Sequence, residues 1–247
     1  MKLRRFKILK ENILGQEAVL DEPQEIRHLT KVLRLKPGDP VILFDGEGKE
    51  YEAQIAGVQS RRVFFRLLKN PRQGASESSL KILLGIGLLK STKLDWLVQK
   101  ATELGVNEIL PFYSLRVVPR PEELAAQNRW TRWEKIAAEA AKQCGRAKIP
   151  KIHPACSFSE VLSAFPEAKK IFLWENEPES TLAEALRVPA PVLFSLVGPE
   201  GGFSEEEANQ AWKAGFAPVR LGPRTLRAET AGLVIVALLQ YLCGDLR

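Results

Sequence analysis

A regular alternation of apolar strands and amphipathic helices after residue 79 limits the possible folds more than any other feature. The runs LKILLGIGL (residues 80–88) and PVLFSLVG (191–198) are apolar almost throughout, which is typical of strands covered on both faces. Between such runs lie segments with apolar residues at helical spacing, among them STKLDWLVQKATELG, which a glycine closes. Strands separated by helices predict an α/β domain with a mostly parallel sheet.

The first 70 residues follow a different pattern. KLRRFKI, PVILF, EYEAQIAGV and RRVFFRLL read as short strands, and DGEGK between the second and third predicts a hairpin. PQEIRHLTKVLRL (residues 23–35) reads as one helix, with Ile26, Leu29, Val32 and Leu33 on its apolar face. Short antiparallel strands with one helix predict a small β-barrel. The polar stretch NPRQGASESS then reads as a linker, and we predict domains at 1–72 and 73–247.

Charge and composition narrow the class of partner. The net charge is +6: the first 151 residues hold 28 lysines and arginines against 18 acidic residues, and the rest hold 8 against 12. Such a basic segment fits a polyanion such as RNA, because phosphate contacts need lysine and arginine; ordinary solubilising charge is the alternative.

The sequence also lacks several features that would indicate other classes. The longest apolar run, AGLVIVALL, is about half of what a membrane span needs, so we expect a buried helix and no membrane association. The N-terminus does not resemble a signal peptide. Three widely spaced cysteines fit a reducing cytoplasm, and two histidines make a metal site or a histidine-based triad unlikely. The sequence therefore predicts a cytoplasmic protein that binds no metal.

The stretch SLVGPEGGFSEEE is a glycine-rich loop with an unusual carboxylate. A phosphate-binding loop would carry a lysine, whereas this one carries Glu200, which would repel a phosphate. Ser204 and Glu207 have capping-box spacing, so a helix is expected directly after the loop. The loop therefore predicts a site for a ligand other than a phosphate, with a capped tight turn as the alternative.

Two further strand ends carry distinctive loops, FLWE and LGPRTLRAET. Ligands bind beyond the carboxyl ends of strands in open parallel sheets, so we expect these loops and the glycine-rich loop to form one pocket. Arg224 and Arg227 next to such a pocket suit an anionic substrate; surface charge at a helix start is the alternative.

Five motifs in chain order extend this reading: EIRHLTKVLRLKPGD, KLDWLVQKATELGV, RWEKIAAEAAKQCGR, LVGPEGGFSEEE and LGPRTLRAETA. Together they resemble the small-subunit ribosomal RNA methyltransferases that modify uridine at N3, a family of the SPOUT class. The resemblance implies a PUA-like RNA-binding β-barrel at 1–72 and a SPOUT α/β domain with a trefoil knot at 73–247. It also implies S-adenosylmethionine as methyl donor, 16S ribosomal RNA in the small subunit as partner, and a homodimer.

The resemblance further implies which residues form the cofactor site. The three loops would enclose S-adenosylmethionine, with backbone groups of Gly198, Leu221 and Leu226 reading the adenine. The full set is Leu173, Trp174, Glu175, Leu196, Val197, Gly198, Pro199, Gly201, Gly202, Leu221, Gly222, Leu226, Thr230 and Ala231.

Catalysis requires removal of the proton on uracil N3, and the sequence leaves the base open. Glu200 and Glu229 are the candidate proton acceptors, and Arg227 could stabilise the developing uracil anion. The predicted RNA contacts are Arg4, Arg5, His28, Lys31, Arg34, Lys142, Arg146 and Arg224. The alternatives are a SPOUT methyltransferase acting on another RNA such as tRNA, a non-catalytic ribosome-assembly factor, and a nucleotide hydrolase, which the missing lysine disfavours.

Overall fold

The chain forms two compact units. The computed structural model describes residues 3–59, 61–69, 71–73, 77–90, 92–116, 129–176 and 180–246. The first unit comprises residues 1–77 together with 141–149, and the second comprises 78–140 and 150–247. Two expected segments lie partly outside the described residues. They are the start of the expected long helix, residues 121–128, and residues 70 and 74–76 of the expected linker.

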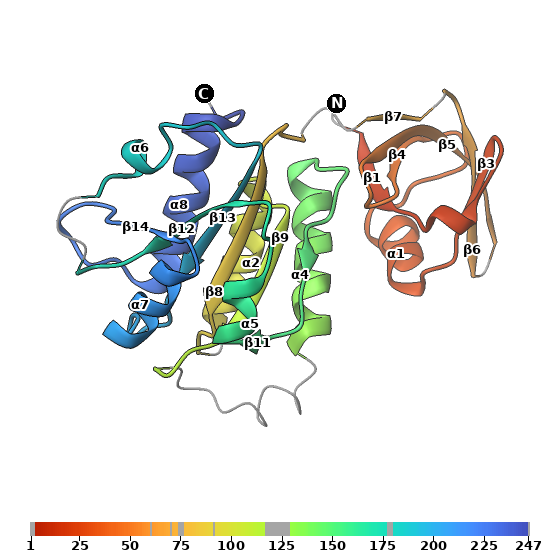
Figure 1. Cartoon of the computed structure of the whole chain (residues 1–247). Coiled ribbons are helices and arrows are strands. Elements are labelled where there is room, and N and C mark those ends of the chain that lie inside the picture. Colours follow the sequence, from red (N-terminus) through yellow and green to blue (C-terminus); the bar gives the residue numbers. More distant parts are fainter. Residues whose placement is uncertain are drawn as a thin grey trace. The chain divides into compact units, whose positions relative to one another are not determined.

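The first unit is built on one curled sheet in which all strand pairs but one are antiparallel (Figure 1). The strand order is β1-β4-β5-β6-β3-β2, with β7 beside β5. The predicted hairpin is confirmed as β4 paired with β5, whereas the parallel pairing of β1 with β4 was not foreseen. The strands are β1 (Arg4–Lys7), β2 (Ile13–Leu14), β3 (Glu17–Leu20), β4 (Pro40–Phe44), β5 (Lys49–Gln59), β6 (Arg62–Leu67) and β7 (Arg72–Gln73), and a single 3-10 turn, η1 (Lys10–Asn12), precedes β2.

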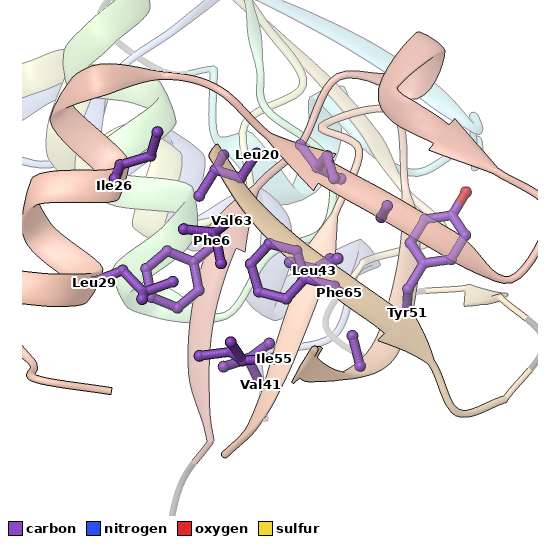
Figure 2. Close-up of a cluster of buried hydrophobic side chains, with 13 residues drawn as sticks. Phe6, Leu20, Ile26, Leu29, Val41, Leu43, Tyr51, Ile55, Val63 and Phe65 are labelled. Carbon is purple, nitrogen blue, oxygen red and sulfur yellow. The ribbon is translucent and has the colours of Figure 1, made fainter. Parts of the chain in front are cut away.

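The predicted helix is present, but its second half is wound differently. It begins as α1 (Pro23–Arg27) and continues as a π-helical segment, η2 (His28–Val32). Ile26 and Leu29 point from this segment toward Phe6 in the core of the sheet (Figure 2). Val32, expected on the same face, is 67% exposed. The wider π turn changes the direction in which residues after Leu29 point, which a regular helical period does not anticipate.

The second unit contains a sheet of seven strands, all parallel where they pair, in the order β10-β9-β8-β13-β12-β14 with β11 beside β9 (Figure 1). This confirms the predicted parallel α/β architecture; the knot implied by the resemblance stays a prediction. The strands are β8 (Lys81–Gly87), β9 (Glu108–Tyr113), β10 (Lys151–Ile152), β11 (Cys156–Ser157), β12 (Lys169–Leu173), β13 (Val192–Val197) and β14 (Ala217–Val219).

Helices cover both faces of this sheet. A side chain added at Gly232 would meet Leu97 and Leu84, so α8 packs on α2 and β8. Leu83, which points to the opposite face, joins a core cluster with residues of the α5 and α7 region, including Val161 and Ala208. The helices are α2 (Thr92–Glu103), α4 (Arg129–Cys144), α5 (Phe158–Ser163), α6 (Leu182–Ala185), α7 (Glu205–Lys213) and α8 (Ala228–Cys243). Within the described part of the chain, no helix is long and apolar enough to cross a membrane.

A charged cluster lies where β8 and β9 begin. Lys81 Nζ is 2.8 Å from Glu108 Oε1, and His153 Nε2 is 2.7 Å from Glu108 Oε2. Burial by itself raises the pKa of Glu108, but the hydrogen bonds and charges of Lys81 and His153 outweigh it and hold the pKa below its ordinary value of 4.5.

We predict that this cluster makes stability depend on pH in the acidic range. Because the folded-state pKa of Glu108 is lowered, its carboxylate stabilises the fold above the unfolded-state value, and this stabilisation is lost as pH falls through the folded-state pKa. In Glu108→Gln, the fall in the free energy of unfolding from about pH 5 to about pH 3 should be shallower than in the wild type. Urea unfolding followed by tryptophan fluorescence measures this. Glu103→Gln is the control, and equal slopes in both variants would contradict the prediction.

Candidate ligand-binding and catalytic site

Three loops of the second unit meet at the carboxyl edge of its sheet. β12 lies between β13 and β14, and Leu173 is paired in register with both Val197 and Val219. Because the three strands end level with one another, the loops that follow them line one pocket, which opens to solvent and has a cavity volume of about 130 Å³. It is lined by Leu173, Trp174, Glu175, Val197, Gly198, Pro199, Glu200, Gly202, Phe203, Val219, Arg220, Leu221, Gly222, Arg224, Thr225, Leu226, Ala228 and Ala231.

Glycines allow the central loop to turn tightly beside its neighbours. The amide of Gly202 donates to the Pro199 carbonyl at 2.9 Å, and Gly202 has a φ of +68°, which favours glycine. A Cβ on Gly202 would also lie 3.3 Å from the Glu175 carboxylate of the adjacent loop. A Cβ on Gly87, at the end of β8, would lie 2.5 Å from the Pro199 nitrogen. Gly87 therefore allows the close packing of β8 against the loop, a role that the sequence did not indicate.

The predicted capping box after the loop is confirmed, and it has a second role. Ser204 and Glu207 cap α7 reciprocally, and the buried Glu207 carboxylate also accepts the amide of Leu115 at 2.9 Å. Next to it, Arg116 Nη1 donates to the Gly201 carbonyl at 2.9 Å. The segment after β9 therefore supports the glycine-rich loop. No sequence motif indicated Arg116, because its partner is a backbone carbonyl far along the chain.

Four charged side chains lie together at one side of the pocket. Lys93 Nζ is 2.6 Å from Glu200 Oε1 and 3.6 Å from Glu229 Oε1. The hydrogen bond to Glu200 is the main reason that the pKa of Lys93 is raised above its ordinary value; burial opposes the increase, and the charges of Glu200 and Glu229 add to it. Arg227 is exposed, is close enough to oppose the same increase, and has no recorded ion pair within the described residues.

The structure brings together most of the predicted cofactor-binding residues. All of them line the pocket except Leu196, Gly201 and Thr230. The Leu196 side chain is buried in the core under the sheet, Gly201 faces Arg116, and Thr230 is exposed on α8. The sequence did not single out five other lining residues. Phe203, Thr225 and Ala228 lie within the quoted loop motifs, and Val219 and Arg220 immediately precede LGPRTLRAET.

The predicted catalytic residues lie near one another but differ in access to the pocket. Glu200 lines the pocket, and its side chain is 23% exposed. Glu229 is buried in the first turn of α8, and its Oε2 has no hydrogen-bond partner among the described residues. In the described part of the chain, no three histidine, cysteine or acidic side chains cluster closely enough to hold a metal ion.

Some of the predicted RNA-contacting residues are exposed, and others are half-buried or paired with acidic side chains. Arg4, Lys31 and Arg34 are exposed on the first unit, and Arg224 is exposed at the pocket. His28 is half-buried, with its ring edge-on to Phe6 at a centroid distance of 6.5 Å.

The expected surface role of three other basic residues needs correction. Arg5 pairs with Glu50 at 2.6 Å, Lys142 with Glu25 at 2.6 Å, and Arg146 with Glu77 at 3.1 Å. Arg146 is only 3% exposed, and the side chains of Arg5 and Lys142 are 12% and 13% exposed. These cations satisfy acidic groups within the first unit, so we leave them out of the proposed RNA surface. The sequence could not show these ion pairs, because each partner acid is distant along the chain.

Comparisons with known proteins agree with this architecture. Residues 76–240 match the family model of the RNA methyltransferase domain, and residues 20–68 match that of the RNA methyltransferase PUA domain. Ribosomal RNA small subunit methyltransferase E of Buchnera aphidicola is 36% identical over 90% of this chain and 88% of its own. The protein of the same name from Bacillus subtilis is 31% identical over 91% of this chain and 90% of its own. The Neisseria gonorrhoeae enzyme of this name, solved with S-adenosylmethionine, superposes with a TM-score of 0.89 at 34% identity and covers 100% of both chains.

We predict that Glu207 is required for the loop to hold its shape. In Glu207→Gln, an amide NH₂ replaces one of the carboxylate oxygens that face backbone N–H groups, so a buried donor loses its acceptor. The loss in free energy of unfolding should be about 2 kcal/mol. Urea unfolding measures this, with Glu206→Gln, an exposed neighbour in the same helical turn, as the matched control. Similar unfolding curves for the two variants would show that the buried carboxylate is dispensable.

Proposed function

Because this chain belongs to the ribosomal RNA small subunit methyltransferase E family, we propose that it uses S-adenosylmethionine to methylate N3 of a uridine in 16S ribosomal RNA. The observation that carries the proposal is the pocket formed by three strand-end loops, which has carboxylates where a phosphate cradle would have lysine. The same proposal includes action on the small ribosomal subunit as a homodimer in the cytoplasm.

The residues of the pocket fit S-adenosylmethionine. The molecule carries an adenine, a carboxylate, an ammonium group and a positively charged sulfur. Leu173, Leu226 and Ala231 offer an apolar wall for the adenine, and the carboxylates of Glu175 and Glu200 suit the positive groups. Trp174 also lines the pocket, and its buried indole N–H has no acceptor among the described residues, so we propose that a bound ligand supplies one.

Basic side chains that line the same pocket suit the carboxylate of this molecule. Arg220 and Arg224 both line the wall made by the loop after β14, and Arg220 Nε also donates to the Gly222 carbonyl at 3.0 Å. When bound, S-adenosylmethionine supplies an electrophilic methyl group attached to sulfur. The protein then has to bind the uracil outside its stack and hold it at the open side of the pocket.

The chain's own chemical task is to take the proton from uracil N3. We propose Glu200 as the proton acceptor, because it lines the pocket and its side chain is the more exposed of the two candidate acids. Glu229 is a weaker candidate, because its carboxylate is buried behind Lys93. We also propose that Arg227, which is exposed and close enough to Lys93 to influence its pKa, stabilises negative charge on the uracil as the proton leaves.

Methylation of unmodified 16S ribosomal RNA or small subunits with labelled donor tests this proposal. The label should map to N3 of one uridine. Glu200→Gln should lower turnover by about 100-fold or more, whereas Glu206→Gln should not. Donor binding, measured by calorimetry, should persist in both variants. Wild-type turnover in Glu200→Gln would remove it as the base. Label found only in tRNA would favour a methyltransferase acting on another RNA, and absence of donor binding would favour a non-catalytic assembly factor.

We further propose that the first unit contacts RNA through Arg4, Lys31 and Arg34, the predicted RNA contacts that are exposed on it. Replacing both Lys31 and Arg34 with alanine should weaken RNA binding, and the slope of log affinity against log salt should fall by roughly one for each lost phosphate contact. Filter binding at several salt concentrations measures both quantities. Alanine at both Arg62 and Arg66, which are exposed on β6, is the control. If the two double variants behave alike, Lys31 and Arg34 do not form a specific RNA contact.

A further inference from the structure

The ammonium group of Lys93 pairs with both acidic residues that the sequence indicated as alternative proton acceptors. It lies in the first turn of α2, Glu200 follows β13, and Glu229 begins α8. The ammonium group is 2.6 Å from Glu200 Oε1 and 3.6 Å from Glu229 Oε1. One cation beside the pocket therefore contacts two acidic residues that each lie more than a hundred residues further along the chain.

The two carboxylates have different surroundings, which gives them different roles. Glu200 is part of the pocket wall, and its Oε1 accepts a hydrogen bond from Lys93. Glu229 is 8% exposed, its Oε2 has no hydrogen-bond partner among the described residues, and its recorded ion-pair partner is Lys93. A buried carboxylate is costly unless a cation compensates it, so Glu229 and Lys93 depend on each other. Of the two acids, Glu200 lines the pocket and Glu229 does not.

Lys93 is itself unsuited to take a proton. The hydrogen bond to Glu200 is the main cause that raises its pKa above the ordinary value, so the side chain stays an ammonium at neutral pH. A permanent cation with several N–H donors can orient a neighbouring carboxylate. It can also be held in place by a second carboxylate behind it.

We infer that Lys93 is a positioning residue for the methyl-transfer reaction: Glu229 anchors its ammonium from inside the protein, and Lys93 fixes the Glu200 carboxylate at the pocket wall. The inference rests on the proposed function. It changes the role of Glu229 from candidate base to anchor, and it explains why a flexible glycine-rich loop can present a carboxylate in one orientation. Lys93 acts through Glu200 and does not contact the substrate in this scheme.

Kinetics of Lys93→Met and Lys93→Arg test the positioning role. Lys100 is the matched control, because it lies on the same helix, pairs with Glu103 at 2.8 Å and has a similarly exposed side chain, 37% against 34%. Lys93→Met should lower kcat between about 10-fold and about 100-fold with a smaller change in the KM for RNA, because the loss is one of orientation. Lys93→Arg should recover part of the loss, and Lys100→Met should match the wild type. Equal kcat in Lys93→Met and Lys100→Met would overturn the inference.

Two measurements test the anchor without requiring activity. Thermal unfolding of Lys93→Met should occur below the wild-type temperature, and adding Glu229→Gln to it should raise the midpoint again, because the buried charge is removed. Competitive acetylation read by mass spectrometry should modify Lys93 more readily in Glu229→Gln than in the wild type, with Lys100 unchanged. If the double variant unfolds no higher than Lys93→Met and acetylation is also unchanged, Glu229 is not the anchor.

These outcomes separate the two proposals. If the wild-type protein fails to methylate 16S ribosomal RNA but the unfolding and acetylation results hold, the ion cluster stands and the proposed function fails. If the wild type is active and kcat is insensitive to Lys93, the proposed function stands and the positioning role fails. Should Lys93→Met not fold, Lys93→Arg kinetics and acetylation in Glu229→Gln still decide the matter.

Discussion

The candidate site depends first on the parallel pairing of β13, β12 and β14. Parallel strands in register end at one edge, and here Leu173 is aligned with both Val197 and Val219. Three loops that are far apart in sequence consequently form a single pocket. Each loop contributes something the others lack: the first brings Trp174 and Glu175, the second brings the tight glycine turn, and the third brings arginines.

The second requirement is a fixed conformation for a loop built from glycines. Glycine permits the turn at Gly202 and the close approach of Gly87 to Pro199, but the glycines themselves have no side chains that could pack. Contacts from elsewhere supply the missing restraint. Glu207 accepts the amide of Leu115, Arg116 donates to the Gly201 carbonyl, and Lys93 holds Glu200. Two of these three residues, Arg116 and Lys93, had no role assigned from the sequence, and Glu207 was expected only to cap the following helix.

The first unit shows how charge can be misread from sequence. Its excess of lysine and arginine fits a polyanion partner, yet Arg5 is largely buried, Arg146 is buried, and they pair with Glu50 and Glu77. Part of the positive charge therefore stabilises the fold, and exposed residues such as Lys31 and Arg34 are left for the proposed RNA contact. Residues 141–149 also belong to this first unit, although they include the last turn of α4, most of which belongs to the second unit.

The sequence by itself determined the α/β class, the parallel sheet, the hairpin, the capping box and the three loops of the pocket, because each follows from local periodicity or spacing. It could not determine the π-helical turn that exposes Val32, the contacts of Arg116, or the meeting of Lys93 with Glu200 and Glu229. These depend on which distant segments become neighbours when the sheet assembles. Only the tertiary structure decided them, because an ion pair between elements more than a hundred residues apart leaves no periodic trace in the chain.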